Sequence, residues 1–140
     1  KVLDEFGVEY EMTISSAHRS PDRTRKLVEK ANEDGIKVII AGAGMAAHLA
    51  GVIAAEFVLP VIGVPIQSGS LNGIVSLLST MQMPPGIPVA TVAINGGKNA
   101  GILAVQILAT SDKQLEDKLV GYKNKLAEGV EEKAGKLKEE

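Results

Sequence analysis

The chain has 140 residues, and its 15 basic and 17 acidic side chains are interspersed. This length lets a chain bury about two thirds of its unfolded surface, so we expect one domain with a core of its own. The balanced charge gives no electrostatic basis for binding nucleic acid or an anionic membrane, and the lack of cysteine excludes disulfides and cysteine-bound metals. Because no apolar run reaches the roughly 18 residues of a membrane span and "KVLDEFG" is unlike a signal peptide, we expect a cytoplasmic protein with a small-molecule ligand.

The first residues predict the end of a helix and then a strand. "KVLDEF" is followed by Gly7, a typical helix stop. Val8 to Ile14 alternate between apolar and polar side chains, which predicts a strand at or near the edge of a sheet. A strand should precede the first helix in such a pattern, so we expect the sequence to be a fragment of a longer chain. The strand at 8–14 would otherwise lack a direct neighbour, unless another chain supplied one.

Strands and helices then alternate. Three runs are almost wholly apolar and β-branched, as in central parallel strands that are covered on both faces: "IKVIIAGAG", "LPVIGVPI" and "IPVATVAIN". Four helices are predicted: one from the N-cap Ser20 to Gly35, one from Met45 to about Phe57, and the stretches "SLNGIVSLLSTM" and "KNAGILAVQILA". The alternation predicts an α/β fold with a parallel sheet and right-handed crossovers.

The C-terminal residues 111–140 predict a highly charged amphipathic helix. Its apolar positions are Leu115, Leu119, Tyr122, Leu126 and Val130. The helix either packs on the flank of the domain formed by residues 1–110 or contacts another subunit.

Both histidines fall where open parallel sheets bind ligands, beyond the carboxyl ends of strands. His18 follows the strand that ends at Ile14, and His48 is expected one turn into the helix after "VIIAGAG". Two histidines alone lack the third ligand of a metal site, so the chemistry that remains is proton transfer by imidazole. On a mostly apolar helix, His48 could equally be a core residue.

Two loops carry binding signals. In "SSAHRSPD", serine hydroxyls, free N–H groups at a helix start and Arg19 indicate a phosphate site, although a capping loop with a surface arginine explains the same residues. "GAGMAA", Gly42 to Ala47, matches a dinucleotide-binding pattern. The next strand, which ends near Gln67, offers no acidic residue for a ribose, so the glycines are better explained by close approach of a small ligand.

Several stretches together resemble one family closely, the N5-carboxyaminoimidazole ribonucleotide mutases, also known as the catalytic subunit of phosphoribosylaminoimidazole carboxylase. They are "SAHRSPDR", "AGAGMAAHLAG", "LPVIGVPIQSGSLNGIVSLLSTMQMPPGIPVATVAIN" and "KNAGILAVQILA". The resemblance implies a flavodoxin-like three-layer α/β/α domain in a homo-octamer. It also implies a step of de novo purine biosynthesis that uses no ATP, metal or other cofactor. In that step a carboxylate moves from N5 to C4 of the ribonucleotide through enclosed carbon dioxide.

The resemblance also implies roles for individual residues. His18 would be the catalytic acid and base that shuttles the proton. The other residues implied to bind the substrate are Ser16 and Arg19 for the 5′-phosphate, Gly44, His48 and Leu49 for the imidazole, and Ser68, Ser70, Leu71 and Asn72 in a loop that closes the pocket across a subunit boundary.

The chain departs from the family pattern in three places. Met45 stands where these proteins usually have a second glycine and Ala50 where they usually have proline, which either tunes the pocket or leaves the methionine facing outward. The family's first strand and its Ser/Asp-rich phosphate loop would precede Lys1.

Two alternatives to the mutase stay open. One is a carboxylase, formally a lyase, that uses aminoimidazole ribonucleotide and free carbon dioxide. The other is a noncatalytic nucleotide-phosphate binding module.

Overall fold

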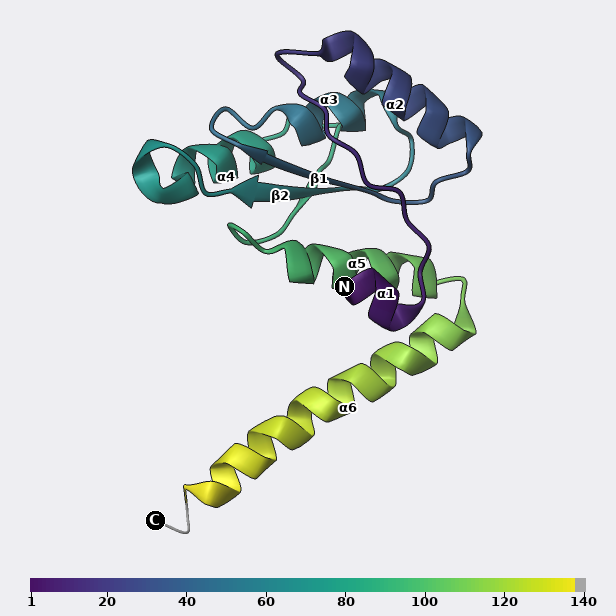
Figure 1. Cartoon of the computed structure of the whole chain (residues 1–140), viewed down its shortest axis with the longest axis vertical. Helices are drawn as coiled ribbons and strands as arrows, with labels where there is room; N and C mark the ends of the chain where they lie inside the picture. Colours follow the sequence, from purple (N-terminus) through teal and green to yellow (C-terminus); the bar gives the residue numbers. More distant parts are fainter. Residues whose placement is uncertain (138–140) are drawn as a thin grey trace.

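Helices cover both faces of a small parallel sheet in the computed structural model, which describes residues 1–137 (Figure 1). In chain order the elements are α1 Val2–Phe6, α2 Pro21–Glu33, β1 Ile39–Gly44, α3 Leu49–Glu56, β2 Val61–Ile66, the 3-10 helix η1 Ser70–Gly73, α4 Ile74–Met81, β3 Ala90–Thr91, α5 Gly97–Ala109 and α6 Lys113–Lys136. The predicted α/β class is confirmed.

The sheet is parallel, with the order β1-β2-β3. β1 pairs with β2 along its whole length, from Ile39 opposite Val61 to Gly44 opposite Ile66. β3 pairs with β2 on the other side. The carboxyl ends of β1 and β2 therefore meet at the same edge of the sheet.

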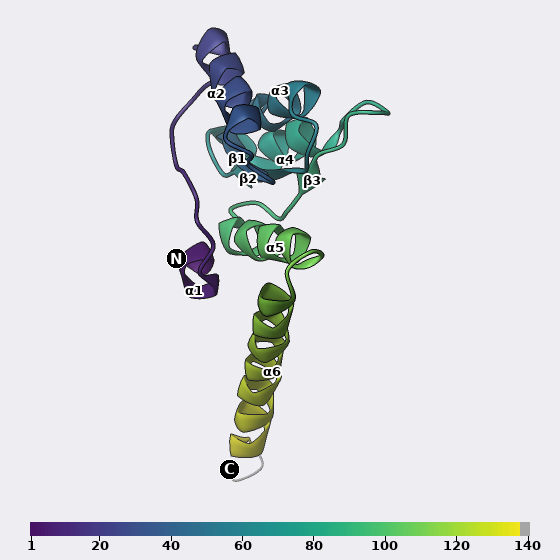
Figure 2. The same cartoon turned by 90° about the vertical axis from the view of Figure 1, so that its right-hand side faces the viewer.

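The helices form two layers around this sheet, as the flavodoxin-like prediction requires. α2, α3 and α4 lie on one face, and α1 and α5 lie on the other (Figure 2). The side chains of β2 alternate between the two faces. Val61 packs in the cluster that contains Ile53 of α3, whereas Ile62 packs with Ala100 and Ala104 of α5.

The third apolar run forms only a short edge strand, so the prediction of three central strands is wrong for it. Only Ala90 and Thr91 of "IPVATVAIN" pair as a strand. Pro88 has no N–H to donate into a ladder before them. After them the chain turns, and the Gly96 N–H donates to the Ala93 carbonyl at 2.8 Å. Apolar composition alone does not reveal where a ladder stops.

The segment 8–14 is extended but is not a strand, so the strand prediction is wrong here. No strand lies beside it within residues 1–137, and its side chains Met12 and Ile14 are 89% and 87% exposed. Arg23 holds its end instead, with Nε donating to the Ile14 carbonyl at 2.8 Å. A ladder needs a neighbouring strand, and the alternating pattern has no buried face here.

Two helices begin later than predicted. The helix expected from Met45 begins at Leu49, because Met45 has a left-handed backbone (φ 54) and the His48 N–H closes a turn on the Ala46 carbonyl at 2.9 Å. His48 is therefore the N-cap of α3, and the expected place one turn inside the helix is wrong. The helix expected over "SLNGIVSLLSTM" is divided into η1 and α4, because Leu71 and Asn72 are also left-handed.

The C-terminal helix α6 begins at Lys113, and residues 138–140 of the predicted helix lie outside the described residues. Leu115 and Leu119 are buried against Phe6 of α1 and Val105 of α5. Beyond its first turns the helix extends away from the body of the molecule (Figures 1 and 2). Its first turns thus pack on the flank, and contact of the rest with a subunit stays a prediction. Within residues 1–137, no helix has both the length and the apolar composition to cross a membrane.

Candidate active site

A cavity of about 240 Å³ opens at the carboxyl end of β1, where the loop before α2 meets the start of α3. Ligands of open parallel sheets bind at this edge. The predicted residues that line the cavity are Ser16, His18, Arg19, Gly44, His48 and Leu49; Ser15, Ala17, Gly42, Ala43 and Ala46 complete it. These additional residues lie within the motifs "SSAHRSPD" and "GAGMAA" already singled out, but no individual role was predicted for them.

Hydrogen bonds between residues close in sequence, made by Ser16 and Ser20, fold the loop before α2. The Ser20 hydroxyl accepts from the Ser16 N–H at 3.2 Å and donates to the Ser16 carbonyl at 3.1 Å. Ser16 Oγ in turn accepts from the Arg19 N–H at 3.2 Å. Ser20 occupies the predicted N-cap of α2, although its hydroxyl bonds back into the loop and not to the first turn of the helix. The result is a tight turn that presents His18 and Arg19 to the cavity.

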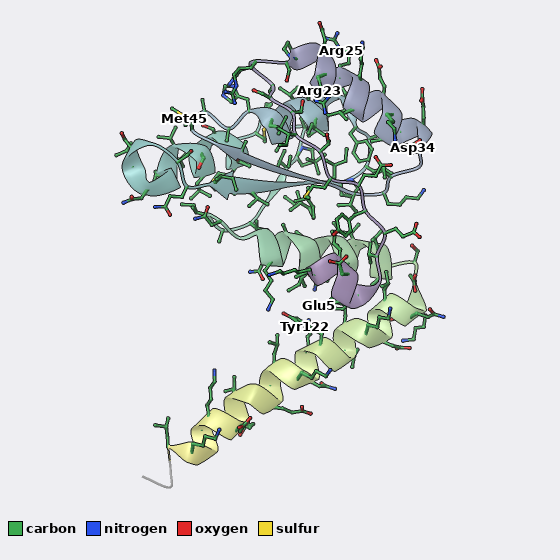
Figure 3. The ribbon with its side chains drawn as sticks, viewed as in Figure 1. Glu5, Arg23, Arg25, Asp34, Met45 and Tyr122 are labelled. Atoms are coloured by element: carbon green, nitrogen blue, oxygen red, sulfur yellow. The ribbon has the colours of Figure 1, made fainter. Side chains whose placement is uncertain are left out.

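Arg19 is the cation that this turn leaves available. Within residues 1–137 its guanidinium has no ion-pair or hydrogen-bond partner, and it lies two residues before the first residue of α2. The neighbouring arginines differ, because Arg23 bonds to the backbone of Ile14 and Arg25 pairs with Asp22 and Glu56 (Figure 3). A free guanidinium beside a helix N-terminus suits a phosphate.

The two histidines meet across the cavity. His18 Nε2 lies 2.9 Å from His48 Nδ1, and their rings pack edge to face with centroids 4.8 Å apart. Both side chains are exposed, so His48 is not a core residue. One nitrogen of this pair must donate and the other must accept, so at least one of the two rings is neutral while the bond exists. The pair can therefore hold and release a proton at the cavity.

The end of β1 is bridged to the end of β2. The Met45 N–H donates to Ser68 Oγ at 2.9 Å. Gly44 is required next to this bond, because a Cβ at Gly44 would lie 3.0 Å from that of Ser68. Ser68 therefore touches the cavity wall from behind and does not line the cavity. Met45 is 65% exposed and is not part of the lining, so its side chain faces outward (Figure 3).

The rest of the predicted loop is not gathered at the cavity in the single chain. Ser70, Leu71 and Asn72 lie on η1, where they are exposed, and none of them lines the cavity. Their contact with a ligand therefore stays a proposal. Asn95, which is not among the predicted site residues, accepts from the Gln67 N–H through its side chain at 2.9 Å. The sequence signal was an Asn-Gly pair after an apolar run, which is typical of a tight turn.

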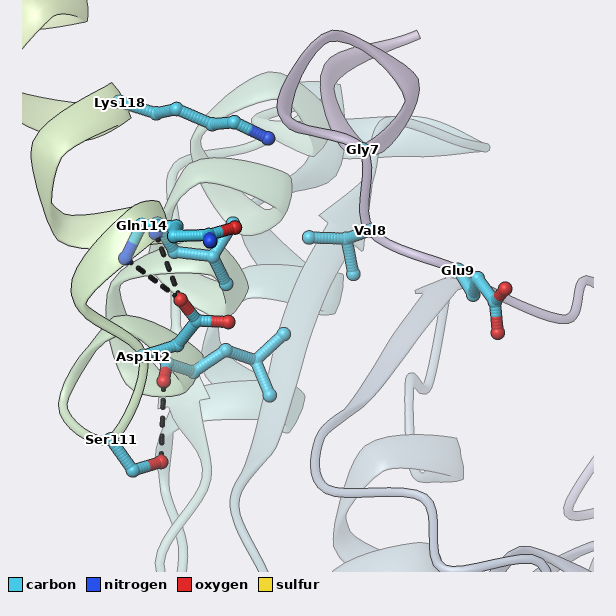
Figure 4. A pocket seen from close by; sticks show the side chains of 9 residues that line it. Gly7, Val8, Glu9, Ser111, Asp112, Gln114 and Lys118 are labelled. Carbon is cyan, nitrogen blue, oxygen red and sulfur yellow. Dashed lines mark hydrogen bonds between the residues drawn. The ribbon is translucent and has the colours of Figure 1, made fainter.

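A larger cavity, of about 460 Å³, lies between residues 7–9 and the start of α6 (Figure 4). Two of its charged groups have structural partners. Asp112 accepts from the N–H groups of Gln114 and Leu115, and Lys118 Nζ donates to the Phe6 carbonyl at 2.7 Å. This cavity contains no histidine or arginine, so it offers no comparable chemistry.

A metal centre finds no ligand set in residues 1–137, where no three His, Cys, Asp or Glu side chains come close enough together to hold an ion. The residues that line the smaller cavity instead supply hydroxyls, backbone amides, one guanidinium and two imidazoles.

The fold and the cavity define a class: flavodoxin-like α/β proteins with a cavity at the carboxyl edge of a parallel sheet, lined here by serines, an arginine and two histidines. Within this class the chain belongs to the AIR carboxylase family, whose model matches residues 1–129. The resemblance stated from the sequence motifs is confirmed.

Individual relatives agree with this assignment. The N5-carboxyaminoimidazole ribonucleotide mutase of Pyrococcus horikoshii is 58% identical over 99% of this chain and 78% of its own length. The phosphoribosylaminoimidazole carboxylase of Schizosaccharomyces pombe is 54% identical over 97% of this chain but only 25% of its own length. Among solved structures, Treponema denticola PurE superposes with a TM-score of 0.85 at 31% identity, over 97% of this chain and 85% of that one.

Proposed function

We propose that this chain is an isomerase of purine biosynthesis that moves the carboxylate of N5-carboxyaminoimidazole ribonucleotide from N5 to C4. The observation that carries the proposal is the His18–His48 hydrogen bond at a cavity that also presents Arg19 and Ser16. The mutase names of relatives at 51–58% identity, among them those of Pyrococcus horikoshii and Saccharolobus solfataricus, support the same reaction.

In the proposed mechanism, Ser16 and Arg19 bind the 5′-phosphate at the start of α2. The N5–carboxylate bond breaks, carbon dioxide leaves, and His18 delivers a proton to N5. C4 then attacks the enclosed carbon dioxide, and the new carbon–carbon bond leaves a hydrogen on C4. His18 removes that proton, so the ring regains its aromaticity and the histidine regains its first state. Positioned proton transfer of this kind contributes about 10²- to 10⁴-fold in rate.

The positions of the other predicted site residues relative to the cavity decide which part of the ligand each would contact. Gly44, His48 and Leu49 would border the imidazole, because they line the same cavity as Arg19. Ser70, Leu71 and Asn72 reach a ligand only if they complete a pocket formed with another subunit, since they are outside the cavity of the single chain. Ser68 acts on the ligand through the backbone of Met45.

The proposal includes a homo-octamer, and the polarity of α4 supports association of copies. Ser76 and Thr80 are 1% and 2% exposed and face the sheet. The Ser76 hydroxyl donates a hydrogen bond to the Ile66 carbonyl at 2.9 Å. The opposite face carries exposed Ile74, Leu78 and Met81. A surface helix of a monomer normally has the reverse polarity. We also propose the cytoplasm as the place of this reaction.

The carboxylase remains the second candidate, since relatives with that name are 53–54% identical. A comparison of two substrates separates the candidates. The purified protein is given N5-carboxyaminoimidazole ribonucleotide without ATP, and separately aminoimidazole ribonucleotide with bicarbonate, and the C4-carboxylated product is followed by ultraviolet absorbance. The mutase proposal expects turnover of the first substrate well above the spontaneous rate; turnover that depends on bicarbonate alone would favour the carboxylase.

A further inference from the structure

The loop that follows β2 returns to its own starting point at Gln67. The loop runs from Gln67 to Gly73, and at its end a Cβ added to Gly73 would lie 3.2 Å from Gln67 Cα and 3.0 Å from Ile94 Cγ2. Gln67 is thus the place where the two ends of the loop meet, beside the chain that leads into α5. Whatever fixes Gln67 also fixes the position from which Ser70, Leu71 and Asn72 project.

Asn95 holds Gln67 at this place. Its side-chain carbonyl accepts from the Gln67 N–H at 2.9 Å, and its side-chain amide donates to Gln67 Oε1 at 3.3 Å. The Asn95 backbone N–H donates to the Pro65 carbonyl at 2.8 Å. One residue therefore bonds to the end of β2 and to the first residue of the loop.

The backbone of Asn95 is held in a conformation that most residues avoid. Its φ is 57°, in the left-handed region, which asparagine tolerates better than other residues with a side chain. Leu71, Asn72 and Met45 have positive φ as well, so every such non-glycine residue within residues 1–137 lies at the carboxyl edge of the sheet. Strain of this kind persists where the surrounding structure requires it, typically at functional sites.

We infer that Asn95 is a positioning residue, which holds the 67–73 loop in register so that its exposed residues can close on the ribonucleotide. The inference rests on the proposed function for its ligand, but the Asn95–Gln67 contact exists independently of any ligand. Because the contact is exposed to solvent, its effect is modest and falls on substrate binding more than on chemistry.

Asn95→Gly is the most informative variant, because glycine keeps the positive φ and removes only the side chain. The variant loses both hydrogen bonds between the Asn95 side chain and Gln67, and we expect KM to rise about 3- to 10-fold. We expect kcat to change less than KM. Asn95→Asp keeps the acceptor for the Gln67 N–H and should recover most of the loss, since the Gln67 amide can rotate to donate to the carboxylate. Gln67→Ala is the matched control, because it leaves the backbone bond in place.

Hydrogen exchange at the Gln67 amide gives a readout that does not depend on activity. We expect slow exchange in the wild-type chain and in Asn95→Asp, and fast exchange in Asn95→Gly. An unprotected Gln67 amide in the wild-type chain would overturn the inference, as would an unchanged KM in a folded Asn95→Gly. Protection at Gln67 in a chain that converts no substrate would instead overturn the proposed function and leave the contact standing.

Discussion

At the scale of single residues, the decisive contact is the hydrogen bond between His18 Nε2 and His48 Nδ1. It orients the His18 ring and gives its Nε2 atom a defined hydrogen-bond partner, whichever of the two nitrogens carries the proton. His48 lies at the N-cap of α3, so the helix start determines where this partner stands. Within residues 1–137, the His18 ring is therefore oriented by His48 at the start of α3 and not by a carboxylate.

Two substitutions at His48 distinguish its hydrogen bond to His18 from the volume that its side chain fills. Asparagine can place an amide group near the position of Nδ1, whereas leucine fills a similar volume without a polar group. We expect His48→Leu to lower kcat about 10-fold, the loss of a hydrogen bond to an ionisable group, and His48→Asn to lower it less. Steady-state kinetics across pH measures both. Equal kcat values for the two variants at every pH would contradict the aiming role.

Met45→Gly should stabilise the chain. The left-handed backbone of Met45 costs about 1 kcal/mol, and its exposed side chain loses little packing on removal. We expect the free energy of unfolding to rise by up to about 1 kcal/mol in denaturant titration. Ala46→Gly, at the next position and without a positive φ, is the control and should destabilise. A fall in stability for Met45→Gly would mean that the methionine packs on a surface outside the single chain.

The residues of the cavity were predictable to the extent that their side chains carry chemistry. Serines, an arginine and a histidine at a helix start indicated the anion site, and the structure brings them to one cavity. Ser68 and Asn95 were not predictable in their observed roles, because a backbone N–H as partner leaves no trace in the sequence.

At the scale of elements, α4 is the helix whose polarity does not fit a monomer. Its buried face consists of small hydroxyl side chains whose hydrogen bonds go to backbone carbonyls: Thr80 Oγ1 donates to the Ser76 carbonyl at 2.7 Å. Small residues there let the helix approach β2 closely at Gly63. A Cβ added to Gly63 would clash with Thr80 Cγ2 of α4 and would lie 2.9 Å from Val89 Cγ1. Its apolar side chains are left on the outside.

Leu78→Glu tests whether copies of the chain cover that outer face. Leu78 is 47% exposed, so a monomer accepts glutamate at little cost, whereas an apolar interface does not. We expect the assembly of the wild-type chain to dissociate in this variant, as measured by sedimentation velocity. Val58→Glu is the matched control, because Val58 is an exposed apolar residue outside α4. An unchanged sedimentation coefficient for Leu78→Glu would exclude α4 from the interface.

The elements also show where pattern reasoning stops. β1, β2, α2 and α5 lie close to their predicted ranges, because buried parallel strands and capped helices have local signals. The segment 8–14 has the period of a strand, yet a strand exists only through a neighbour, which the pattern cannot supply. The early end of β3 and the late start of α3 depend on adjacent turns, at residues 93–96 and at residues 45–48, which the apolar pattern does not reveal.

At the scale of the whole molecule, one cavity opens beside an exposed loop. It is bordered by the carboxyl edge of the sheet, the turn at residues 16–20 and the start of α3. The fold class and the family were predictable from motifs that run through most of the chain, and the family model bears them out. The proposed homo-octamer was not predictable from periodicity, since association depends on which surfaces of separate copies meet.

The most direct test is the effect of His18→Asn on the conversion of N5-carboxyaminoimidazole ribonucleotide to its C4-carboxylated isomer without ATP. Asparagine can keep a hydrogen bond but cannot shuttle a proton at neutral pH. We expect kcat to fall about 10²- to 10⁴-fold. Ribonucleotide affinity, measured by calorimetry, should be nearly unchanged because Arg19 and Ser16 remain. A kcat of His18→Asn equal to that of the wild-type chain would contradict the proton-shuttle mechanism. So would a wild-type chain that binds the nucleotide without converting it.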